Sequence, residues 1–325
     1  MKDYSKIDMR DALFDEIYEI AKNDKNVVVI VADTDAFSLH RFKEDFPDQY
    51  INVGVAEQNM ILVAAGLAMC GKKVFLYSLI PFIALRCFEQ IKVNICSMNL
   101  PVTIIGGGAG FSFGYDGPTH HAVCDIAIMR TLPEIKIYNI SDSFMAKECA
   151  HIAHTTKSPL YIRLDKGKVN KLYDDVNFTA GASIVRKGSG SDLCIFSTGT
   201  MTHTAIAVAN ELLQYGIDAF VIDVHRLKDI NKFYINNVLD RFSKIVTIEE
   251  NSIVGGLGSI LAEIICDEKH LTKISLLQRI ALPDEQAFIY GNRDFLHKYY
   301  GLDKDSIVET ITEWIATNEK KTIKK

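Results

Sequence analysis

The sequence predicts an α/β protein built from two doubly wound domains. Apolar segments of strand length alternate with segments of helical periodicity along almost the whole chain, which is the pattern of helices layered on largely parallel sheets. Some apolar runs are continuous, as in residues 27–32, and such runs are typical of strands covered on both faces. The alternation stops over residues 165–179, where charged residues accumulate, and then begins again.

The first block of this alternation extends from residue 11 to residue 164. We expect helices over residues 11–21, 38–45, 58–70, 83–96, 122–130 and 143–155. We expect strands over residues 27–32, 51–53, 74–77, 102–105, 135–139 and 160–164. Pro47 ends the second helix because proline cannot continue one, and Gly71 is typical of the position after a helix.

The second block repeats the same architecture. We expect strands over residues 193–197, 219–224, 245–248 and 274–280, and helices over residues 202–215, 233–242 and 258–266. A chain of 325 residues is long enough for two domains of ordinary size. We therefore predict a first domain over residues 1–170, a linker over residues 171–180 and a second domain over residues 181–325.

Composition excludes several classes of function. The formal net charge of −5 and the pI near 6 give no electrostatic basis for binding nucleic acid. No apolar run approaches the roughly 18 residues of a membrane-spanning helix, and the N-terminal residues lack the apolar core of a signal peptide. The seven cysteines show neither Cys-x-x-Cys pairs nor the spacing of a zinc site. We expect a reduced, cytoplasmic protein with no nucleic-acid or membrane partner.

A carboxylate in an unusual place is the strongest functional signal. Residues 54–60 read GVAEQNM, so Glu57 lies between a short apolar run and a strongly apolar helix. Ligands of doubly wound sheets bind at the carboxyl ends of the strands, and a carboxylate in apolar surroundings there can share a proton with a ligand nitrogen. The alternative is an ordinary acidic residue that the dipole of the helix N-terminus stabilises.

A second polar motif, DGPTHH, occupies residues 116–121. Gly-Pro fixes a turn that presents the carboxylate of Asp116 and the imidazoles of His120 and His121. Histidine can exchange protons near neutral pH, so this turn is a second candidate for the functional site. The alternative is an Asx-type turn in which Thr119 caps the next helix.

Together these motifs resemble the pyrimidine-binding part of the transketolase family, whose enzymes depend on thiamine diphosphate. The family pattern G-[IV]-A-E-[QH]-[NH], followed by a helix rich in alanine and glycine, matches residues 54–68. Residues 197–201 and 249–258 resemble the family's C-terminal domain. The resemblance covers nearly all of the chain but only the C-terminal half to two-thirds of a full-length transketolase.

The resemblance implies roles for individual residues. Glu57 corresponds to the glutamate that hydrogen-bonds N1′ of the cofactor's aminopyrimidine ring and so promotes formation of the thiazolium ylide. Asp116 and His120 correspond to catalytic-site residues that contact sugar hydroxyls. The C-terminal domain is implied to be structural, with His225 and Glu250 near its interface and no catalytic role.

The segment that the resemblance assigns to the wall of the pyrimidine site departs from the family. Residues 77–90 read YSLIPFIALRCFEQ, where transketolases typically carry S-T-F-x-x-F-x-x-R-A-x-D-Q. Ile80 and Ile83 therefore stand where stacking aromatic rings are usual. An aliphatic wall still buries a ring through its apolar area, and we expect Tyr77 or Phe82 to compensate. Arg86 matches a family arginine near the pocket, with a surface ion pair as the alternative.

Further substrate-binding residues are implied at three places. His40 and Arg41 lie near the position after the first strand where transketolases carry a phosphate-binding arginine. Lys166 stands where the family has a second arginine, and a lysine binds phosphate as a point charge without bidentate geometry. A plain surface pair with Asp165 is the alternative for Lys166. His121 lies where the family often has glutamine, so it is a substrate-binding candidate whose role is open.

Equally informative is a motif that the chain lacks. Thiamine diphosphate enzymes bind Mg²⁺ and diphosphate through Gly-Asp-Gly with a downstream Asn, because a hard cation and two phosphates need oxygen ligands and backbone amides. No Gly-Asp-Gly occurs in the sequence. We therefore expect the diphosphate and Mg²⁺ sites on an N-terminal partner subunit of about 270 to 300 residues. We expect an α2β2 assembly and no metal ligands on this chain.

The resemblance and the missing motif together imply the C-terminal subunit of a heteromeric transketolase. We expect such an enzyme to transfer a two-carbon ketol unit between sugars or sugar phosphates through a thiamine diphosphate ylide. One alternative is a subunit similar to deoxyxylulose phosphate synthase or to the β subunit of a decarboxylating 2-oxoacid enzyme, which decarboxylation of pyruvate with no turnover of ketoses would favour. The other is a non-catalytic transketolase-like scaffold, which full activity of a Glu57→Gln variant would favour.

Overall fold

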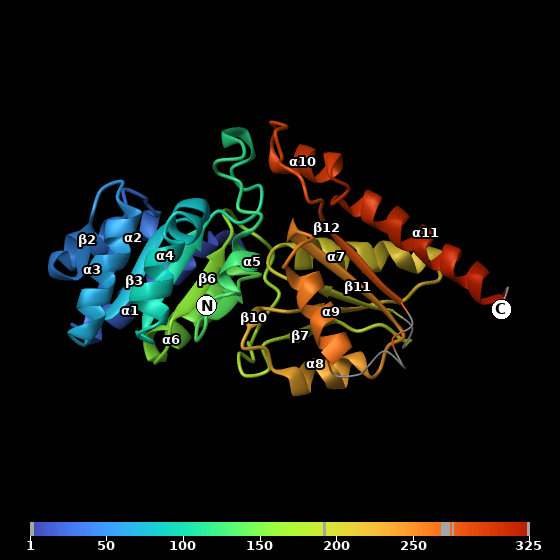
Figure 1. The fold of residues 1–325 in the computed structure, drawn as a ribbon, viewed down its shortest axis with the longest axis horizontal. Coiled ribbons are helices and arrows are strands. Elements are labelled where there is room, and N and C mark those ends of the chain that lie inside the picture. The colour runs from blue at the N-terminus through green and yellow to red at the C-terminus, as the bar shows by residue number, and fades with distance from the viewer. Residues whose placement is uncertain (1–2, 191–192, 268–273, 275, 324–325) are drawn as a thin grey trace.

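Two α/β units lie side by side in the computed structural model, which describes residues 3–190, 193–267, 274 and 276–323 (Figure 1). Each unit has a central sheet that is parallel except for one edge strand. The predicted class, α/β with two doubly wound sheets, is confirmed. All seven cysteines are free thiols, as expected. In the described part of the chain, no helix is both long and apolar enough to cross a membrane.

The first sheet has seven strands in the order β10-β5-β6-β4-β3-β1-β2. Its strands are β1 (Val27–Val31), β2 (Tyr50–Asn52), β3 (Lys73–Leu79), β4 (Val102–Gly107), β5 (Lys136–Asn139), β6 (Leu160–Leu164) and β10 (Arg226–Lys228). Every residue of β1, β4 and β6 is buried, because helices cover both faces, and this explains their continuous apolar sequences. The edge strand β10 is antiparallel to β5.

The helices of the first unit form two layers. The layer of α1 (Met9–Asn23), α2 (Phe37–Asp45) and α6 (Ser143–Thr155) packs on one core cluster. The layer of α3 (Glu57–Met69) and α5 (Asp125–Met129) packs on another. Asp8 and Asp142 cap α1 and α6 by accepting backbone N–H groups, which satisfies donors that a helix start leaves free.

The second sheet has five strands in the order β12-β11-β8-β9-β7. Its strands are β7 (Ser183–Arg186), β8 (Leu193–Ser197), β9 (Phe220–Asp223), β11 (Lys244–Ser252) and β12 (Leu276–Leu282). Its helices are α7 (Met201–Leu212), α8 (Lys232–Leu239), α9 (Leu257–Asp267), α10 (Arg293–Tyr299) and α11 (Lys304–Ile323). The strand expected over residues 274–280 begins and ends later, and Ser275 lies outside the described residues.

Two expected helices differ from prediction. The helix over residues 83–96 is divided into η3 (Pro81–Leu85), α4 (Phe88–Gln90) and η4 (Ile91–Cys96), of which η3 and η4 are π-helical. Arg86 N–H donates to the carbonyl five residues back, at Pro81, and such wide turns are frequent at functional sites. The helix over residues 122–130 begins only at Asp125, because the backbone of Ala122 pairs with Gly110 in an antiparallel bridge.

The segment between the two units packs closely against both. The second carboxylate oxygen of Asp142 accepts the backbone N–H groups of Leu172 and Tyr173 at 2.6 and 3.1 Å. Tyr173 then donates its hydroxyl to Asp223 at the end of β9, at 2.5 Å. The linker predicted over residues 171–180 therefore contributes side chains to a buried polar cluster.

This cluster makes stability depend on pH. Burial raises the pKa of Asp223 to about 6 from 3.8, although hydrogen bonds from Tyr173, Ser141 and Thr202 oppose the rise. The folded state favours the protonated form of Asp223 more than the unfolded state does. The resulting contribution to the unfolding free energy is therefore present below pH 4 and is lost as the pH rises through 6. Relative to Asp223→Asn, the wild-type unfolding free energy should fall by about 2 kcal/mol from pH 4 to pH 7. Urea unfolding across this range measures the difference, and parallel pH profiles for the two proteins would contradict it.

Candidate active site

Glu57 is the first residue of α3 and its side chain is only 3% exposed. The preceding turn is held by Asn52, whose side-chain oxygen accepts the N–H groups of Asp33 and Gly54 at 3.1 and 3.0 Å. Gly54 has φ of +71°, which glycine adopts without strain. The turn from β2 into α3 thus buries a carboxylate at the helix N-terminus, where the helix dipole favours negative charge.

Arg86 is the ionic partner of Glu57. Its Nη1 atom donates to Oε2 of Glu57 at 2.8 Å, and its own side chain is 45% exposed. The interruption of the helix sets the position of Arg86, because this residue follows directly on the π-helical η3. The pair therefore joins a buried carboxylate to a guanidinium that reaches solvent.

A continuous series of ring contacts leads from this pair to the DGPTHH loop. The Arg86 guanidinium lies 4.5 Å from the centre of the Phe82 ring, and Phe82 meets His120 edge-on at 5.1 Å. Phe113 lies 6.3 Å from His120, and Lys166 Nζ lies 5.0 Å from the centre of the Phe113 ring. The structure thus joins Glu57, Arg86, Phe82, His120 and Lys166, which were predicted from separate motifs.

The loop over residues 111–121 projects at the top of the molecule in Figure 1, beside α10 of the second unit. A bridge between Gly110 and Ala122 closes its base, with N···O distances of 3.0 and 2.9 Å. Asp116 ends a turn of 3₁₀ helix and is exposed, and Gly117 has φ of +72°. Residues Asp116 and His120 are therefore displayed on a projecting loop with a fixed base.

Thr119 does not cap a helix, which was the alternative for this motif. Its hydroxyl lies 3.0 Å from Nδ1 of His120 and donates to the Asp116 carbonyl at 3.4 Å. Cys124 is the residue before α5, and it makes no side-chain capping bond. The motif thus forms a self-contained turn in which Thr119 orients the His120 ring.

His121 faces inward. It is 4% exposed, its Nε2 lies 3.4 Å from the Gly114 carbonyl, and its ring meets Phe111 edge-on at 4.8 Å. Burial lowers the pKa of His121, which keeps the ring neutral near pH 7. Its Nε2 atom supports the loop from within, whereas His120 is only half-buried.

The predicted wall residues fall into two layers. Ile80 and Ile83 are fully buried in the core cluster that α3 covers. Tyr77 lies in the opposite cluster and meets Phe14 of α1 edge-on at 5.0 Å, because successive residues of a strand point to opposite faces. The expectation that Tyr77 shares a wall with Ile80 and Ile83 is corrected, and Phe82 is the half-buried ring on the site's side.

The two residues predicted after the first strand have partners at the surface. His40 Nε2 lies 2.7 Å from Asp35, and both side chains are more than half exposed. The guanidinium of Arg41 lies 3.7 Å from the centre of the Tyr18 ring and 3.6 Å from Asp15. His40 thus stays accessible beside the end of β1, whereas Arg41 is directed toward α1.

A buried ion pair that sequence analysis missed supports the loop from below. Arg163 Nε donates to Asp125 at 3.0 Å, Tyr161 donates its hydroxyl to Asp125 at 2.7 Å, and Arg163 Nη2 donates to the Ala122 carbonyl at 2.7 Å. Asp125 and Arg163 are 0% and 4% exposed. The pair is therefore a structural element under the loop base. The sequence did contain a signal for this pair, namely the charged Arg163 inside the otherwise apolar segment LYIRL. A charged residue in such a strand is buried only with a partner.

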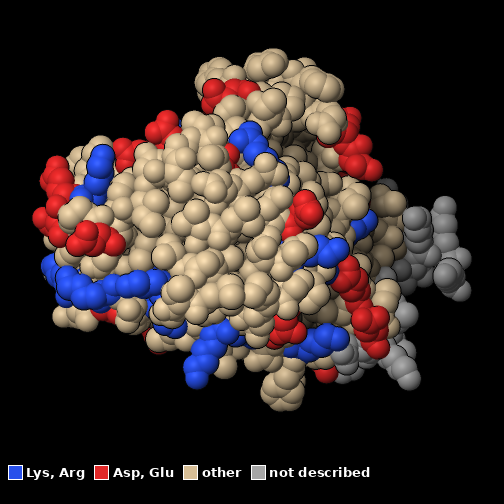
Figure 2. All heavy atoms as spheres, turned by 60° about the vertical axis from the view of Figure 1, so that its left-hand side comes forward, with Lys and Arg blue, Asp and Glu red and all other residues tan. Residues whose placement is uncertain are grey.

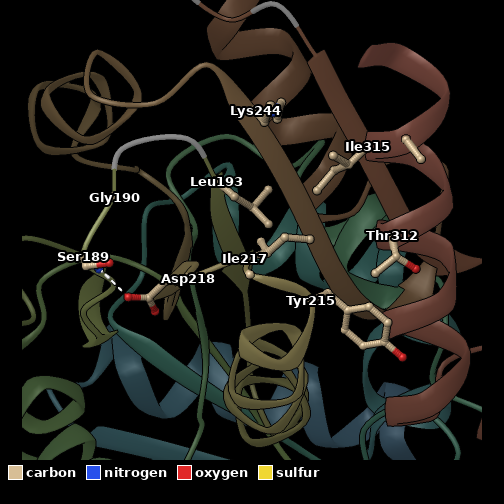
Figure 3. A pocket seen from close by; sticks show the side chains of 11 residues that line it. Ser189, Gly190, Leu193, Tyr215, Ile217, Asp218, Lys244, Thr312 and Ile315 are labelled. Atoms are coloured by element: carbon tan, nitrogen blue, oxygen red, sulfur yellow. Dashed lines mark hydrogen bonds between the residues drawn. The ribbon is translucent and has the colours of Figure 1, made fainter. Parts of the chain in front are cut away.

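Glu57 lines neither of two hollows in the structure. One, of about 500 Å³, is lined by Leu193, Tyr215, Ile217 and Thr312 in the second unit, with Asp218 fixed by Ser189 N–H at 2.6 Å (Figure 3). Another, of about 410 Å³, lies between the units and includes Pro118, His121 and Tyr300 in its lining. None of the residues predicted to bind the cofactor lines the first hollow, so its size does not make it the active site.

Comparison with known proteins gives the family. Residues 5–171 match the family described as transketolase, pyrimidine binding domain, and residues 181–307 match the transketolase C-terminal domain. An apulose-4-phosphate transketolase subunit of Phocaeicola vulgatus is 31% identical, over 94% of this chain and 97% of that protein. The 1-deoxy-D-xylulose-5-phosphate synthase of Caldanaerobacter subterraneus is 32% identical over 90% of this chain, which spans 46% of that enzyme.

A solved structure agrees with these sequence matches. A split gene transketolase, described as an inactive beta4 tetramer, superposes with a TM-score of 0.82 at 31% identity. The alignment covers 95% of this chain and 98% of that one. The similarity therefore extends over both units of the structure and over almost the full length of that chain.

Proposed function

Because the chain belongs to the transketolase family, we propose that it is the C-terminal subunit of a split transketolase that transfers a two-carbon ketol unit between sugars or sugar phosphates. The observation that carries this proposal is the buried Glu57 carboxylate, joined through Arg86, Phe82 and His120 to the exposed loop of Asp116. The Phocaeicola relative, named for apulose-4-phosphate, supports a sugar substrate.

The residues around Glu57 suit the aminopyrimidine ring of thiamine diphosphate. A flat heterocycle needs a hydrogen-bonding group at its edge and apolar contact at its faces. The buried Glu57 carboxylate offers the first, and the half-buried ring of Phe82, which lies against the Arg86 partner of Glu57, offers the second. When bound, the cofactor supplies the carbon nucleophile that attacks a ketose carbonyl. We propose that Glu57 holds and shares a proton at the ring nitrogen, while Arg86 keeps its carboxylate oriented.

Substrate would be held from the other side of the site. We propose that Asp116 accepts hydrogen bonds from sugar hydroxyls and that His120 donates one to them. Both side chains lie on the projecting loop. Lys166 is exposed beside Phe113 and can attract an anionic group of the substrate. His40, exposed beyond β1, is a second candidate for that contact.

A partner subunit would complete the site. Apolar side chains on and beside α3 and η4 are exposed, namely Val55, Leu62, Met69 and Val93, and exposed apolar patches mark interaction surfaces. Figure 2 turns this end of the molecule forward, and a broad area with few charged side chains is visible there. We propose that this surface packs on an N-terminal subunit that carries Gly-Asp-Gly and the Mg²⁺ ligands, in an α2β2 assembly.

Reconstitution tests the proposal. This chain and the partner are purified separately and mixed with Mg²⁺ and thiamine diphosphate, and transfer from a ketose to an aldose is measured. We expect activity only in the mixture. Leu62→Ser should weaken co-purification with the partner, whereas Leu213→Ser, which changes a leucine of similar exposure in the second unit, should not. Equal co-purification of both variants would argue against the α3 surface.

A second candidate is condensation of pyruvate with an aldehyde, as the similarity to deoxyxylulose phosphate synthase suggests. That similarity covers less than half of the synthase, so it is the weaker support. Turnover of pyruvate by the reconstituted pair, with no turnover of ketoses, would favour this candidate over ketol transfer.

A further inference from the structure

A buried carboxylate of the second unit reaches into the base of the DGPTHH loop. Glu250 lies on β11, and its Oε1 accepts the backbone N–H of Phe111 at 3.0 Å. Gly110 has φ of +58°, and a Cβ there would lie 2.1 Å from the Glu250 carboxylate. Only glycine permits this approach, so the loop base rests directly on Glu250.

Two side chains of α10 hold Glu250 in turn. Arg293 and His297 of α10 donate to its carboxylate, with Nε of Arg293 at 3.0 Å and Nε2 of His297 at 2.6 Å. Burial alone would raise the pKa of Glu250, but Arg293 and His297 outweigh it and hold this pKa well below its usual range. The carboxylate is therefore a fixed anion at neutral pH.

The same cluster also holds the next residue of the loop, Ser112. Nη2 of Arg293 lies 2.6 Å from Asp165, which follows β6, and Asp165 accepts the hydroxyl of Ser112. Thr200 of the second unit also donates to Asp165 at 2.6 Å. Phe111 and Ser112, the first residues of the loop, are thus both fixed to one interdomain ion cluster.

The base of the loop and the second unit together set the position of the loop tip. The hydrogen bonds within the turn of Asp116 and His120 are local, and a Cβ at Gly114 or Gly117 would meet Gly291 or Tyr290 of the second unit. The Phe111 end, the Gly110–Ala122 bridge and this packing therefore fix where Asp116 and His120 lie. We propose that Glu250 is a positioning residue of the reaction, through which the second unit holds Asp116 and His120 in place for the sugar. This inference rests on the proposed function of the loop.

Positioning predicts a particular kinetic change. Glu250→Gln in the reconstituted enzyme should raise KM for the ketose roughly 10- to 100-fold, because a charge-assisted contact is lost. Proton exchange at C2 of bound thiamine diphosphate, which depends on Glu57, should change less than about twofold, well below the effect of one such contact. Glu211→Gln is the matched control, because Glu211 pairs with Lys304 within the second unit at 3.0 Å and should leave KM unchanged.

A double-mutant cycle separates positioning from general support. The KM effects of Glu250→Gln and Asp116→Asn should be non-additive, because both act through the same loop contact with the sugar. If Glu250→Gln does not fold, His297→Leu, which removes one donor to the same carboxylate, takes its place. Unchanged KM, additive effects, or a parallel loss of C2 exchange would each overturn the inference. Failure of the proposed function is distinct, because the wild-type mixture itself would then transfer no ketol unit.

Discussion

Replacing Glu57 by glutamine should lower kcat/KM of the reconstituted enzyme by about 10²- to 10⁴-fold, the usual contribution of a proton-transferring side chain. Glutamine keeps the shape of the side chain and can still accept the Arg86 N–H group that now reaches Oε2 at 2.8 Å. It cannot share a proton with a ring nitrogen. The loss should appear equally in C2 proton exchange of the bound cofactor, before any sugar is added.

Folding should survive this change. Arg86 is nearly half exposed, so water can solvate its charge once the carboxylate is gone. Glu89→Gln, an exposed glutamate three residues after Arg86, is the control and should keep full activity. If Glu57→Gln were as active as this control, the residue would have no role in proton transfer, and a scaffold function would become the better explanation.

Replacing Asp125 by alanine should have the largest effect on stability, about 3–5 kcal/mol of the unfolding free energy. The variant leaves the Arg163 guanidinium buried without its carboxylate and deprives the Tyr161 hydroxyl of its acceptor. An uncompensated buried charge is far more costly than a missing ion pair. Urea and thermal unfolding of the isolated chain measure the difference.

The paired variant Asp125→Leu with Arg163→Met is the control. It removes both charges and keeps the apolar volume, and such replacements of a whole buried pair are often close to neutral. We therefore expect the double variant to recover part of the lost stability, because the buried charge is gone while the Tyr161 hydroxyl still lacks its acceptor. A single variant no less stable than the double variant would show that Arg163 finds another partner, such as the Ala122 carbonyl that it already contacts.

The architecture could be predicted because local sequence patterns determine most of its helices and strands. The strands β6 and β8 and the helix α6 begin and end at the residues that the apolar periodicity indicated. Continuous apolar runs and capping residues act over a few positions, so one sequence suffices to find them. The short edge strand β10 escaped prediction because its three residues pair with β5, which lies far earlier along the chain.

The site could be predicted only in part. Glu57 and the residues 116–121 stand in compact motifs, but their connection through Arg86 and Phe82 depends on the π-helical turn η3, and nothing in the spacing distinguished it from an ordinary helix. The anchoring of the loop by Glu250 joins residues 139 positions apart. Such contacts depend on how the two units pack against each other, so they cannot be predicted from local sequence patterns.

Cofactor titration is the most direct test of a divided active site. Thiamine diphosphate with Mg²⁺ is titrated by calorimetry into this chain, into the N-terminal partner and into their equimolar mixture. In our account Glu57 binds the pyrimidine end of the cofactor and the partner binds the diphosphate end. Tight binding, with one cofactor per pair of chains, should therefore appear only in the mixture. Tight Mg²⁺-dependent binding by this chain alone would contradict the division of the site between two subunits.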